Sequence, residues 1–514
     1  MTNINKYKKT TAIQILVLFL IIALPICLFS QNDTTNILNK NISLKIKNGN
    51  LYDALITISK KTGYNFSYNS ELISGDKKIK INVKNKSVNE ILHILLSDTT
   101  FCFKVISNQI VICGKNEDNS IFENSENLNY IIVKGKIIDS KFNSSLSYAT
   151  IWVEETNIGT ISNSDGEFIF KIPYQKKNKN LIVSFIGYKN LQIPINQLTK
   201  YNNLLMLDAN VIPIQEVIIR SSSPQALLSS AISLIPNNYC IQPAYLTSFY
   251  RETIKRDNNY VAILEAVVDI YKTSYSSDFF DRLKIIKSRK NMNYLLMDTL
   301  VVKIKGGLQS SLMLDIVKNK PNFLTSDYFH YYYYNIVDIV DFDNQSAYVI
   351  EFKPKKYIDD ELLYSGKIYL DIKSLSIRKI EFWIEPKILK KQGHLFIVSH
   401  SRKFKVKSQK AIYKVSYKEL NNKNYLNYVS ADIEFNVRKR GELFFDKYNT
   451  LIELAVNKID TTDVERFKYK EIVKSKKNFF DIVDKYLDNY WGDYNYIKPD
   501  ESLQKGIEKL YQGK

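Results

Sequence analysis

The sequence predicts a multidomain, mostly β protein. We expect a small α+β domain, a β-sandwich and a β-rich α+β domain with a curved antiparallel sheet, in that order. The chain has 514 residues, which is enough for three or four domains. Apolar and polar residues alternate with period two in many short stretches, as they do in strands with one buried face. Two stretches near the N-terminus instead carry helix-capping signals before an apolar stripe.

The first 30 residues have the composition of a secretory signal peptide. Three lysines precede an uncharged apolar run over residues 12–29, and Ser30 stands before the polar Gln31. We expect cleavage after Ser30. The alternative is an uncleaved anchor helix, because the apolar run approaches the length that spans a membrane. Export would bring the chain into an oxidising compartment, where cysteines can pair.

Residues 41–114 form the first expected domain, with the element order β-α-β-β-α-β-β. Asn50 is the expected N-cap of a helix over residues 51–62, with Asp53 at its third position. A second helix follows a capping box formed by Ser87 and Glu90. Strands are expected around Leu44 and over residues 64–68, 78–83, 101–106 and 109–113.

Two segments of this domain carry a resemblance. The stretches NGNLYDALITISKKTGYNFSYNSELI and VKNKSVNEILHILLSDTTFCFKVISNQIVICG resemble the short domain at the N-termini of secretins and TonB-dependent transporters. The resemblance covers residues 41–114. It implies a docking module for other periplasmic proteins, including regulators that signal across the inner membrane. Residues 115–130 are polar and are expected to form a linker.

Cys102 and Cys113 are predicted to form a disulfide. A two-residue turn at 107–108 would place them opposite one another in an antiparallel hairpin. Such opposed residues have Cα atoms about 4.5–5.5 Å apart, a separation that a disulfide allows. Cys240 would remain unpaired. Full alkylation of both thiols in the denatured, unreduced protein would contradict the prediction.

Residues 131–208 are expected to form a small β-sandwich. The alternating stretches VKGKIID, ATIWVEE, EFIFKI and LIVSFIGY are separated by turn residues. Asp165 and Gly166 give a strong hairpin signal, because glycine accepts a positive φ without steric cost. Gly187 is assigned to a turn as well.

Several residues of this stretch stand in a familiar order, namely Gly135, Ala149, Thr150, Gly159, Thr160, the turn 164–168 and the segment 184–188. They resemble the carboxypeptidase regulatory-like domain, a transthyretin-like sandwich common in Gram-negative envelope proteins. In that family the domain is an accessory module without catalytic residues. The resemblance therefore implies that Asp165, Gly166 and Gly187 make turns. With the N-terminal resemblance, it implies an outer-membrane neighbourhood.

Residues 224–514 form the third expected domain, which in pattern is similar to the curved sheet of periplasmic lipoprotein carriers. A helix should begin at Pro224 and end near Ile235. A terminal helix should begin after Asp500 or Ser502, with an apolar face. Clear strands are expected over residues 347–352, 366–372, 377–384, 411–418, 429–438 and 451–458.

Two features of this domain leave alternatives open. The segments IPNNY and FYRE resemble a group of uncharacterised envelope proteins that share the sandwich. Within FYRE, Arg251 and Glu252 are either an ion pair that orders the domain or a functional pair. The four tyrosines 331–334 form either a stacking surface for sugars or lipid headgroups, or packing positions of a strand.

The sequence contains no recognisable catalytic or metal-binding motif. A zinc carboxypeptidase needs a histidine with a glutamate three residues later, and none of the four histidines has one. There is no glycine-rich phosphate loop and no G-x-S-x-G turn. We therefore expect a protein that is not an enzyme and that needs no metal and no cofactor.

The charge balance bears on the partners. The net charge of +19 and a pI near 9.3 suit nucleic acid, anionic lipid, an anionic glycan or an acidic protein. The export signal argues against nucleic acid.

The preferred function is that of a non-enzymatic protein in the periplasm, associated with the outer membrane. It would dock envelope proteins, such as TonB-system or regulator components, or bind a ligand through its C-terminal domain. One alternative is an integral outer-membrane β-barrel related to TonB-dependent transport. Lysine runs at 353–356 and 474–477 argue against it, since charge at membrane depth is costly. The other alternative is a hydrolase whose site is assembled from residues far apart in sequence.

Overall fold

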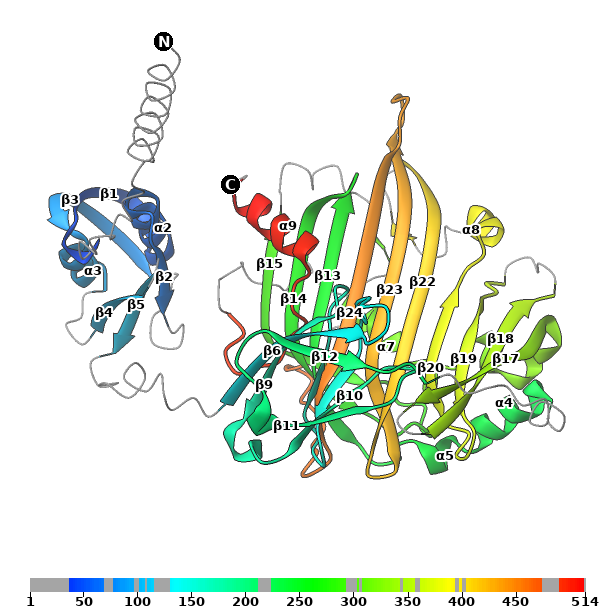
Figure 1. The fold of residues 1–514 in the computed structure, drawn as a ribbon. Coiled ribbons are helices and arrows are strands. Elements are labelled where there is room, and N and C mark those ends of the chain that lie inside the picture. Colours follow the sequence, from blue (N-terminus) through cyan, green and yellow to red (C-terminus); the bar gives the residue numbers. More distant parts are fainter. Residues whose placement is uncertain are drawn as a thin grey trace, which may run out of the picture. The chain divides into compact units, whose positions relative to one another are not determined.

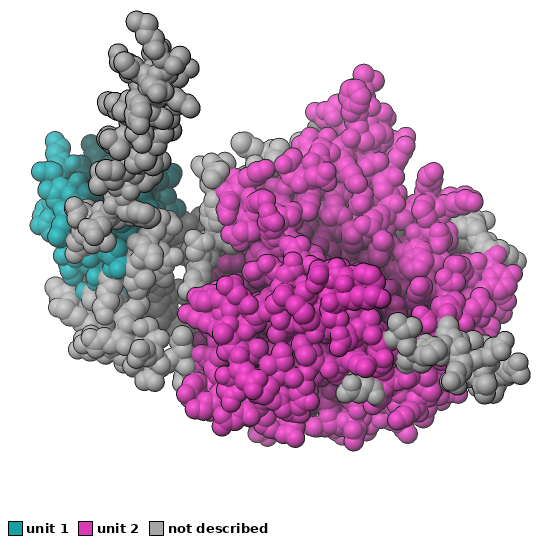
Figure 2. Space-filling view, in the orientation of Figure 1, with its two compact units in different colours: residues 1–128 teal, residues 129–514 magenta. Residues whose placement is uncertain are grey.

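The computed structural model describes residues 37–68, 77–96, 101–106, 109–114, 130–210, 223–292, 303–304, 307–342, 345–355, 361–392, 397–399, 404–473 and 490–512 (Figure 1). They fall into two compact units, residues 1–128 and residues 129–514 (Figure 2). The expected signal peptide, most of the expected linker, the second lysine run, His394 and His400 lie outside the described residues.

The first unit has the element order that the sequence predicts. Its elements are η1 (Ile37–Asn39), β1 (Asn41–Asn50), α2 (Leu51–Thr62), β2 (Asn65–Tyr68), β3 (Lys78–Ser87), α3 (Val88–Leu96), β4 (Phe101–Ile106) and β5 (Gln109–Gly114). Strands β1 and β3 pair antiparallel, and β5 lies between β2, to which it is parallel, and the antiparallel β4. The apolar faces of α2 and α3 pack with these strands into one core.

The predicted N-cap at Asn50 and the predicted capping box of Ser87 and Glu90 are both confirmed, and Asn50 proves to form a capping box with Asp53 as well. The Asn50 side chain accepts a hydrogen bond from the Asp53 amide at 2.8 Å, and the Asp53 carboxylate accepts one from the Asn50 amide at 3.3 Å. At α3, the Ser87 amide donates to Glu90 at 3.0 Å and the Glu90 amide donates to the Ser87 hydroxyl at 3.2 Å. These bonds satisfy amides that have no partner within the helix, so each helix begins where its local sequence predicts.

The hairpin of β4 and β5 has the register that the sequence predicts. Cys102 lies directly opposite Cys113, and Ile106 lies opposite Gln109. The turn at 107–108 and the side chains of both cysteines lie outside what the structure describes. The disulfide therefore stays a prediction. Cys240, in the second unit, is a buried free thiol.

The second unit begins with a β-sandwich of two small sheets. Its strands are β6 (Tyr130–Asp139), β7 (Thr150–Val153), β8 (Gly159–Ile161), β9 (Glu167–Pro173), β10 (Asn180–Ser184), β11 (Leu191–Pro194) and β12 (Asn203–Leu207). One sheet has the order β12-β6-β9 and the other β11-β10-β7-β8. The parallel pairing of β12 with β6 is not foreseen from the sequence.

The predicted strand LIVSFIGY proves to be half strand and half turn. β10 ends at Ser184, and Gly187 has a φ of 85°. Its amide donates to the Asp341 carbonyl at 2.7 Å, outside the sandwich. The prediction of one long strand is wrong because a contact outside the sandwich holds this stretch. The assignment of Gly187 to a turn agrees with its left-handed φ.

A ten-stranded antiparallel sheet is the largest sheet that the structure describes in the second unit (Figure 1). Its order is β15-β14-β13-β24-β23-β22-β20-β19-β18-β17. The strands are β13 (Ala244–Arg256), β14 (Asn259–Lys272), β15 (Arg282–Met292), β17 (Tyr332–Phe342), β18 (Gln345–Pro354), β19 (Ser365–Asp371), β20 (Ile377–Trp383), β22 (Phe404–Leu420), β23 (Lys423–Lys439) and β24 (Asp446–Asp460). The six strands expected from the sequence are all present, although several are longer than expected. A short separate pair joins β16 (Lys303–Ile304) to β21 (Ile397–Ser399).

One face of the large sheet carries the main hydrophobic core. It is covered by α4 (Pro224–Ser233), α5 (Ile235–Asn238), α7 (Leu308–Met313), η4 (Asn322–Leu324) and η5 (Ser326–Tyr331). Tyr332 and Tyr334 are buried here, while Tyr333 between them is 59% exposed. Two of the four tyrosines are therefore core residues, as the packing interpretation expects.

The other face of the sheet carries the sandwich and the C-terminal helix α9 (Glu501–Gln512). β8 contacts β24, and α9 lies across β14 and β15 (Figure 1). The predicted apolar face of α9 is confirmed, since Leu503, Ile507 and Leu510 pack on Ile263. A further helix, α8 (Pro386–Gln392), packs beside β22.

Candidate functional site: a pocket between the sandwich and the large sheet

Hydrogen bonds of the backbone and of side chains join the sandwich to the large sheet. The Ile459 amide donates to the Asn157 carbonyl at 3.1 Å, and the Asn157 side-chain amide donates to the Ile459 carbonyl at 2.6 Å. At another point, the Asn210 side chain donates to the Asp341 carboxylate at 2.5 Å. Each of these bonds forms only when its donor and acceptor lie close together. The two layers are therefore held at a defined spacing.

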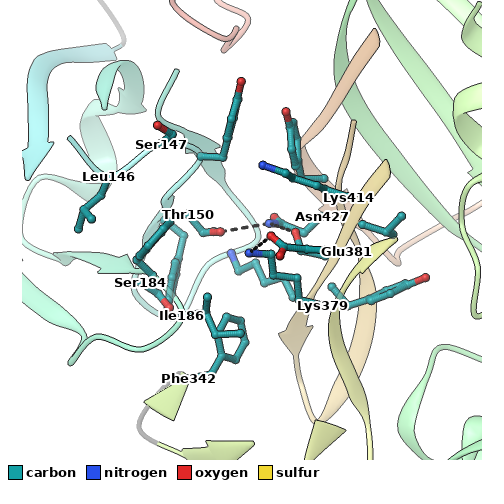
Figure 3. Close-up of a pocket in the computed structure, with 18 of the residues that line it drawn as sticks. Leu146, Ser147, Thr150, Ser184, Ile186, Phe342, Lys379, Glu381, Lys414 and Asn427 are labelled. Atoms are coloured by element: carbon teal, nitrogen blue, oxygen red, sulfur yellow. Dashed lines mark hydrogen bonds and ion pairs between the residues drawn. The ribbon is translucent and has the colours of Figure 1, made fainter. Parts of the chain in front are cut away.

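A pocket of about 370 Å³ lies between these layers, and we call it the seam pocket. One wall comes from the sandwich and contributes Tyr148, Thr150, Trp152, Ser184, Phe185 and Ile186. The other wall comes from the large sheet and contributes Lys379, Glu381, Lys414, Ser416, Lys418, Asn427 and Tyr428, with Phe342 at one end. Figure 3 shows Lys414, Glu381 and Asn427 on one side of the space and Thr150 and Ser184 on the other.

Strand periodicity places the charged residues of the sheet wall. In β22, Tyr413, Val415 and Tyr417 point into the main core. Successive strand residues point to opposite faces, so Lys414, Ser416 and Lys418 must face the sandwich. Lys379 and Glu381 occupy the equivalent positions of β20, where Lys379 lies opposite Ser416. Two neighbouring strands thus direct three lysines into one pocket.

The lysines of the pocket lie close to its aromatic rings. Lys418 Nζ lies 5.0 Å from the centroid of the Trp152 ring, and Lys414 Nζ lies 5.8 Å from that of Tyr148. Both distances fall within the range of a cation–π contact. Such contacts orient the ammonium groups along the aromatic wall. A bound ligand would therefore meet a cation and a ring face together.

Glu381 is the only acid among the described lining residues. Its carboxylate lies 2.8 Å from Lys379 Nζ. Burial would raise the pKa of Glu381, but Lys379, Lys414 and Lys367 outweigh burial, so that its pKa lies below the ordinary value. The glutamate is therefore ionised at neutral pH. Against three lysines it leaves the pocket with excess positive charge.

Hydrogen-bonding groups line the rest of the pocket. The Asn427 side-chain amide donates to the hydroxyls of Thr150 at 3.2 Å and Ser416 at 3.3 Å, which connects the two walls. The Ser184 hydroxyl is buried and has no hydrogen-bond partner among the described residues. A buried hydroxyl without a partner costs free energy. Ser184 is one of the residues that line the pocket.

A buried charge network lies beside the pocket on the same face of the sheet. Glu265 accepts hydrogen bonds from Arg251 Nε at 2.8 Å and from Arg289 Nε at 2.6 Å. Burial opposes ionisation of Glu265, but the two arginines outweigh it and lower its pKa. The Tyr428 hydroxyl donates to Glu453 at 3.0 Å, and burial raises the pKa of Glu453. The arginine pairs are satisfied within the protein, and their role here is structural.

The predicted pairing of Arg251 with Glu252 is wrong. Adjacent residues of β13 point to opposite faces of the sheet, so their side chains cannot meet. Arg251 pairs with Glu265 on the sandwich side. Glu252 faces the main core, where the Tyr250 hydroxyl donates to it at 2.8 Å.

Asp165 and Gly166 lie in the predicted turn. The Asn163 side chain accepts from the amide of Asp165 at 3.0 Å, and Gly166 has a φ of 76°. Asp165 has a further contact that sequence reasoning missed. Its carboxylate accepts from the Glu501 amide at 3.1 Å, at the first residue of α9.

The histidines do not gather at any site that the structure describes. His93 lies in α3, with its ring centroid 4.7 Å from that of Phe103. His330 lies in η5 against the ring of Tyr331. Within the described ranges, no group of three His, Cys, Asp or Glu side chains is placed to hold a metal ion.

Sequence reasoning missed the seam pocket itself. The alternation of lysine with core residues over residues 414–418 marks a polar strand face, and this signal was visible. It does not show whether water or another domain covers that face. The aromatic wall comes from a segment more than 200 residues away in the chain.

Comparison with family models identifies two domains. Residues 64–112 match the secretin and TonB N terminus short domain, and residues 133–219 match the CarboxypepD_reg-like domain. The chain carries both domains, and both fit an envelope-associated, TonB-related protein. Comparison with curated proteins found no match. Every helix in the described part of the chain is too short or too polar to cross a lipid bilayer.

Several solved structures are similar to parts of the chain. A LolA superfamily protein from Nitrosomonas europaea is 9% identical over 49% of this chain and 99% of that chain, with a TM-score of 0.18. An outer membrane lipoprotein-sorting protein domain from Vibrio parahaemolyticus is 9% identical over 46% of this chain and 93% of that chain, with a TM-score of 0.20. A chain of the MucA/MucB complex of Pseudomonas aeruginosa is 10% identical over 47% of this chain and 100% of that chain, with a TM-score of 0.15. At such TM-scores these likenesses carry no argument about this chain.

Proposed function

With a secretin and TonB N terminus short domain and a CarboxypepD_reg-like domain in one chain, we propose a non-catalytic periplasmic protein associated with the outer membrane. Its second unit binds a ligand in the seam pocket. The ligand carries an anionic group, such as a phosphate or a carboxylate, on a ring-shaped body such as a sugar. An anionic glycan of the envelope has this chemistry.

The make-up of the seam pocket carries this proposal. Its volume of about 370 Å³ lies in the range of small-molecule sites. Lysine ammonium groups form charge-assisted hydrogen bonds with phosphate and carboxylate. The rings of Tyr148 and Trp152 offer apolar faces on which a sugar can pack. The Ser184 hydroxyl and the Asn427 amide are polar groups that could fix its orientation.

The chemistry of the lining residues favours binding over catalysis. The described lining includes no histidine and no cysteine, so its serines have no imidazole to activate them. Its one carboxylate is paired with Lys379. These residues suit recognition of a charged ring without supplying a nucleophile and its base.

Titration of the mature chain tests the ligand proposal. We expect glucose 6-phosphate to bind and glucose to bind much more weakly, measured by calorimetry and by the tryptophan emission of the protein. Replacing Lys414 and Lys418 with alanine should weaken sugar-phosphate binding by about tenfold or more, because each lysine supplies a charged hydrogen bond. The control is Lys509→Ala on the exposed side of α9. Equal binding by the double variant and the wild type would contradict the proposal.

The N-terminal unit supports a second part of the same function, the docking of an envelope partner. The match of residues 64–112 to the secretin and TonB N terminus short domain carries this part. TonB-system or regulator components are the proposed partners. Cross-linking in intact cells, followed by mass spectrometry, should recover such a protein with the full chain. The same cross-linking with a chain that lacks residues 41–114 should not recover this partner protein.

A further inference from the structure

The turn between β23 and β24 holds the two most exposed large apolar side chains among the described residues. Leu443 is 83% exposed and Phe444 is 85% exposed. They occupy the tip of a long hairpin that projects from the second unit (Figures 1 and 2). Adjacent exposed apolar residues at a projecting point indicate a contact surface.

The hairpin is built to present this tip. Paired residues of β23 and β24 reach Val437 and Asp446. The neighbouring strand β13 ends earlier, where the Asp257 amide donates to the Lys447 carbonyl at 2.8 Å. The turn at 440–445 therefore extends beyond its neighbour on that side. It contains Gly441 with a φ of 96°, a conformation that few other residues adopt.

Phe445, the next residue, supports the tip from below. Its ring centroid lies 5.0 Å from Lys407 Nζ and 4.8 Å from the Arg438 guanidinium carbon. These cations fix the ring against the strands. Leu443 and Phe444 are left to point outward, and they do not collapse onto the sheet.

Six basic residues lie in the turn or on the strand ends next to it, and we call them the basic collar. Its members are Lys405, Lys407, Arg438, Lys439, Arg440 and Lys447. Acids are fewer here, and some already have partners. Asp446 pairs with Arg256 at 2.8 Å, Glu434 pairs with Lys447 at 2.8 Å, and Glu442 is exposed in the turn. The collar therefore has a net positive charge.

We propose that the hairpin tip anchors the protein to an anionic lipid surface. Leu443 and Phe444 enter the boundary between headgroups and acyl chains, and the basic collar contacts the anionic headgroups. Exposed apolar side chains beside lysine and arginine are complementary to such a surface. The alkyl stems of the collar lysines can lie along the apolar boundary while their ammonium groups stay in water. This anchor is independent of the seam pocket.

Sedimentation with vesicles tests the anchor in the mature full chain. We expect binding to vesicles of phosphatidylcholine mixed with phosphatidylglycerol, and much less binding to phosphatidylcholine alone. Added salt should weaken this binding, because it screens the collar. Replacing Leu443 and Phe444 with serine should weaken it by about tenfold or more, since two large apolar side chains then stay out of the lipid. Lys439→Glu with Arg440→Glu should weaken binding only to the anionic vesicles.

The matched control is Phe142→Ser, which removes a ring that is 72% exposed on the sandwich. It should bind vesicles like the wild type. All these side chains are exposed, so each variant should keep the wild-type circular dichroism and melting temperature. Failure of the wild type to bind anionic vesicles would overturn the proposal, as would unchanged binding by the serine variant. Self-association that disappears in the serine variant, without vesicle binding, would assign the tip to a second copy of the chain instead.

Discussion

Glu252 shows how one buried carboxyl can make stability depend on pH. It is 4% exposed, and burial raises its pKa from 4.5 to about 7, although the hydrogen bond from Tyr250 opposes the shift. The folded protein therefore holds this proton more tightly than the unfolded chain does. Below about pH 4.5 the group has no effect on the free energy of unfolding. Between about pH 4.5 and 7 the unfolded chain releases this proton while the folded protein keeps it, so the free energy of unfolding falls by about 3 kcal/mol and stays at that lower value above pH 7.

We expect Glu252→Gln to remove this pH dependence. Glutamine is close in shape to the protonated acid and cannot ionise. At pH 8 the free energy of unfolding of the variant should exceed that of the wild type by about 3 kcal/mol, and at pH 4.5 the two should be nearly equal. Urea unfolding at both pH values measures this difference. A gain that is equal at the two pH values would show that Glu252 does not titrate in this range.

Glu265 is expected to stabilise the folded protein through its ion pairs. It is fully buried between Arg251 and Arg289, so neutralising it leaves two buried cations without their shared partner. Glu265→Gln should lower the free energy of unfolding by about 3–5 kcal/mol. The control is Glu501→Gln, which breaks an exposed pair with Lys505 and should leave stability unchanged. Similar small effects of both changes would mean that water reaches the buried cluster.

At the scale of elements, the packing of α9 on the large sheet depends on one close contact. Gly506 faces Tyr260, and a Cβ at this position would meet the aromatic ring. In an isolated helix, glycine to alanine would be favourable by about 1 kcal/mol. Here overpacking should outweigh that gain, because such clashes typically cost about 1–3 kcal/mol.

We therefore expect Gly506→Ala to loosen α9 from the sheet even though it favours the helix. Hydrogen exchange of the α9 amides should become faster, and trypsin should cleave the C-terminal segment sooner. Gln504→Ala on the exposed side of the same helix is the matched control and should not accelerate either process. Slower exchange in the glycine variant would show that Tyr260 moves aside at little cost.

At the scale of the whole molecule, the sandwich and the large sheet are one compact unit. Asn495 forms hydrogen bonds with both the sandwich and the large sheet. It is buried, its side chain accepts from the Lys171 amide at 2.8 Å, and it donates to the Lys171 carbonyl at 3.2 Å. A third bond runs from Asn457 to its carbonyl at 2.7 Å.

We expect the second unit to unfold in a single calorimetric transition that includes the sandwich. Asn495→Ala leaves the Lys171 backbone groups without partners and should lower the stability of this transition by about 1–3 kcal/mol. The exposed Asn178→Ala is the control and should have no effect. A separate transition for residues 131–208 would show that the sandwich is energetically independent of the sheet.

The features predicted correctly from the sequence depend on residues close together in the chain. Asn50 and Asp53 cap α2, and Asp165 and Gly166 form a turn, because each pair acts over three residues or fewer. The register that places Cys102 opposite Cys113 follows from counting outward from one short turn. Period-two alternation likewise located six strands of the large sheet.

The tertiary structure alone decided which of these elements meet. Arg251 lies beside Glu265 because β13 and β14 pair in one register, and no signal next to Arg251 in the sequence specifies that partner. Contacts between distant segments also decide two strand pairings. β24 pairs with β13, and β12 pairs with β6 in parallel. The seam pocket has the same origin. Alternation shows that Lys414 and Lys418 leave the core, but a strand face that meets water and one that meets another domain carry the same alternation.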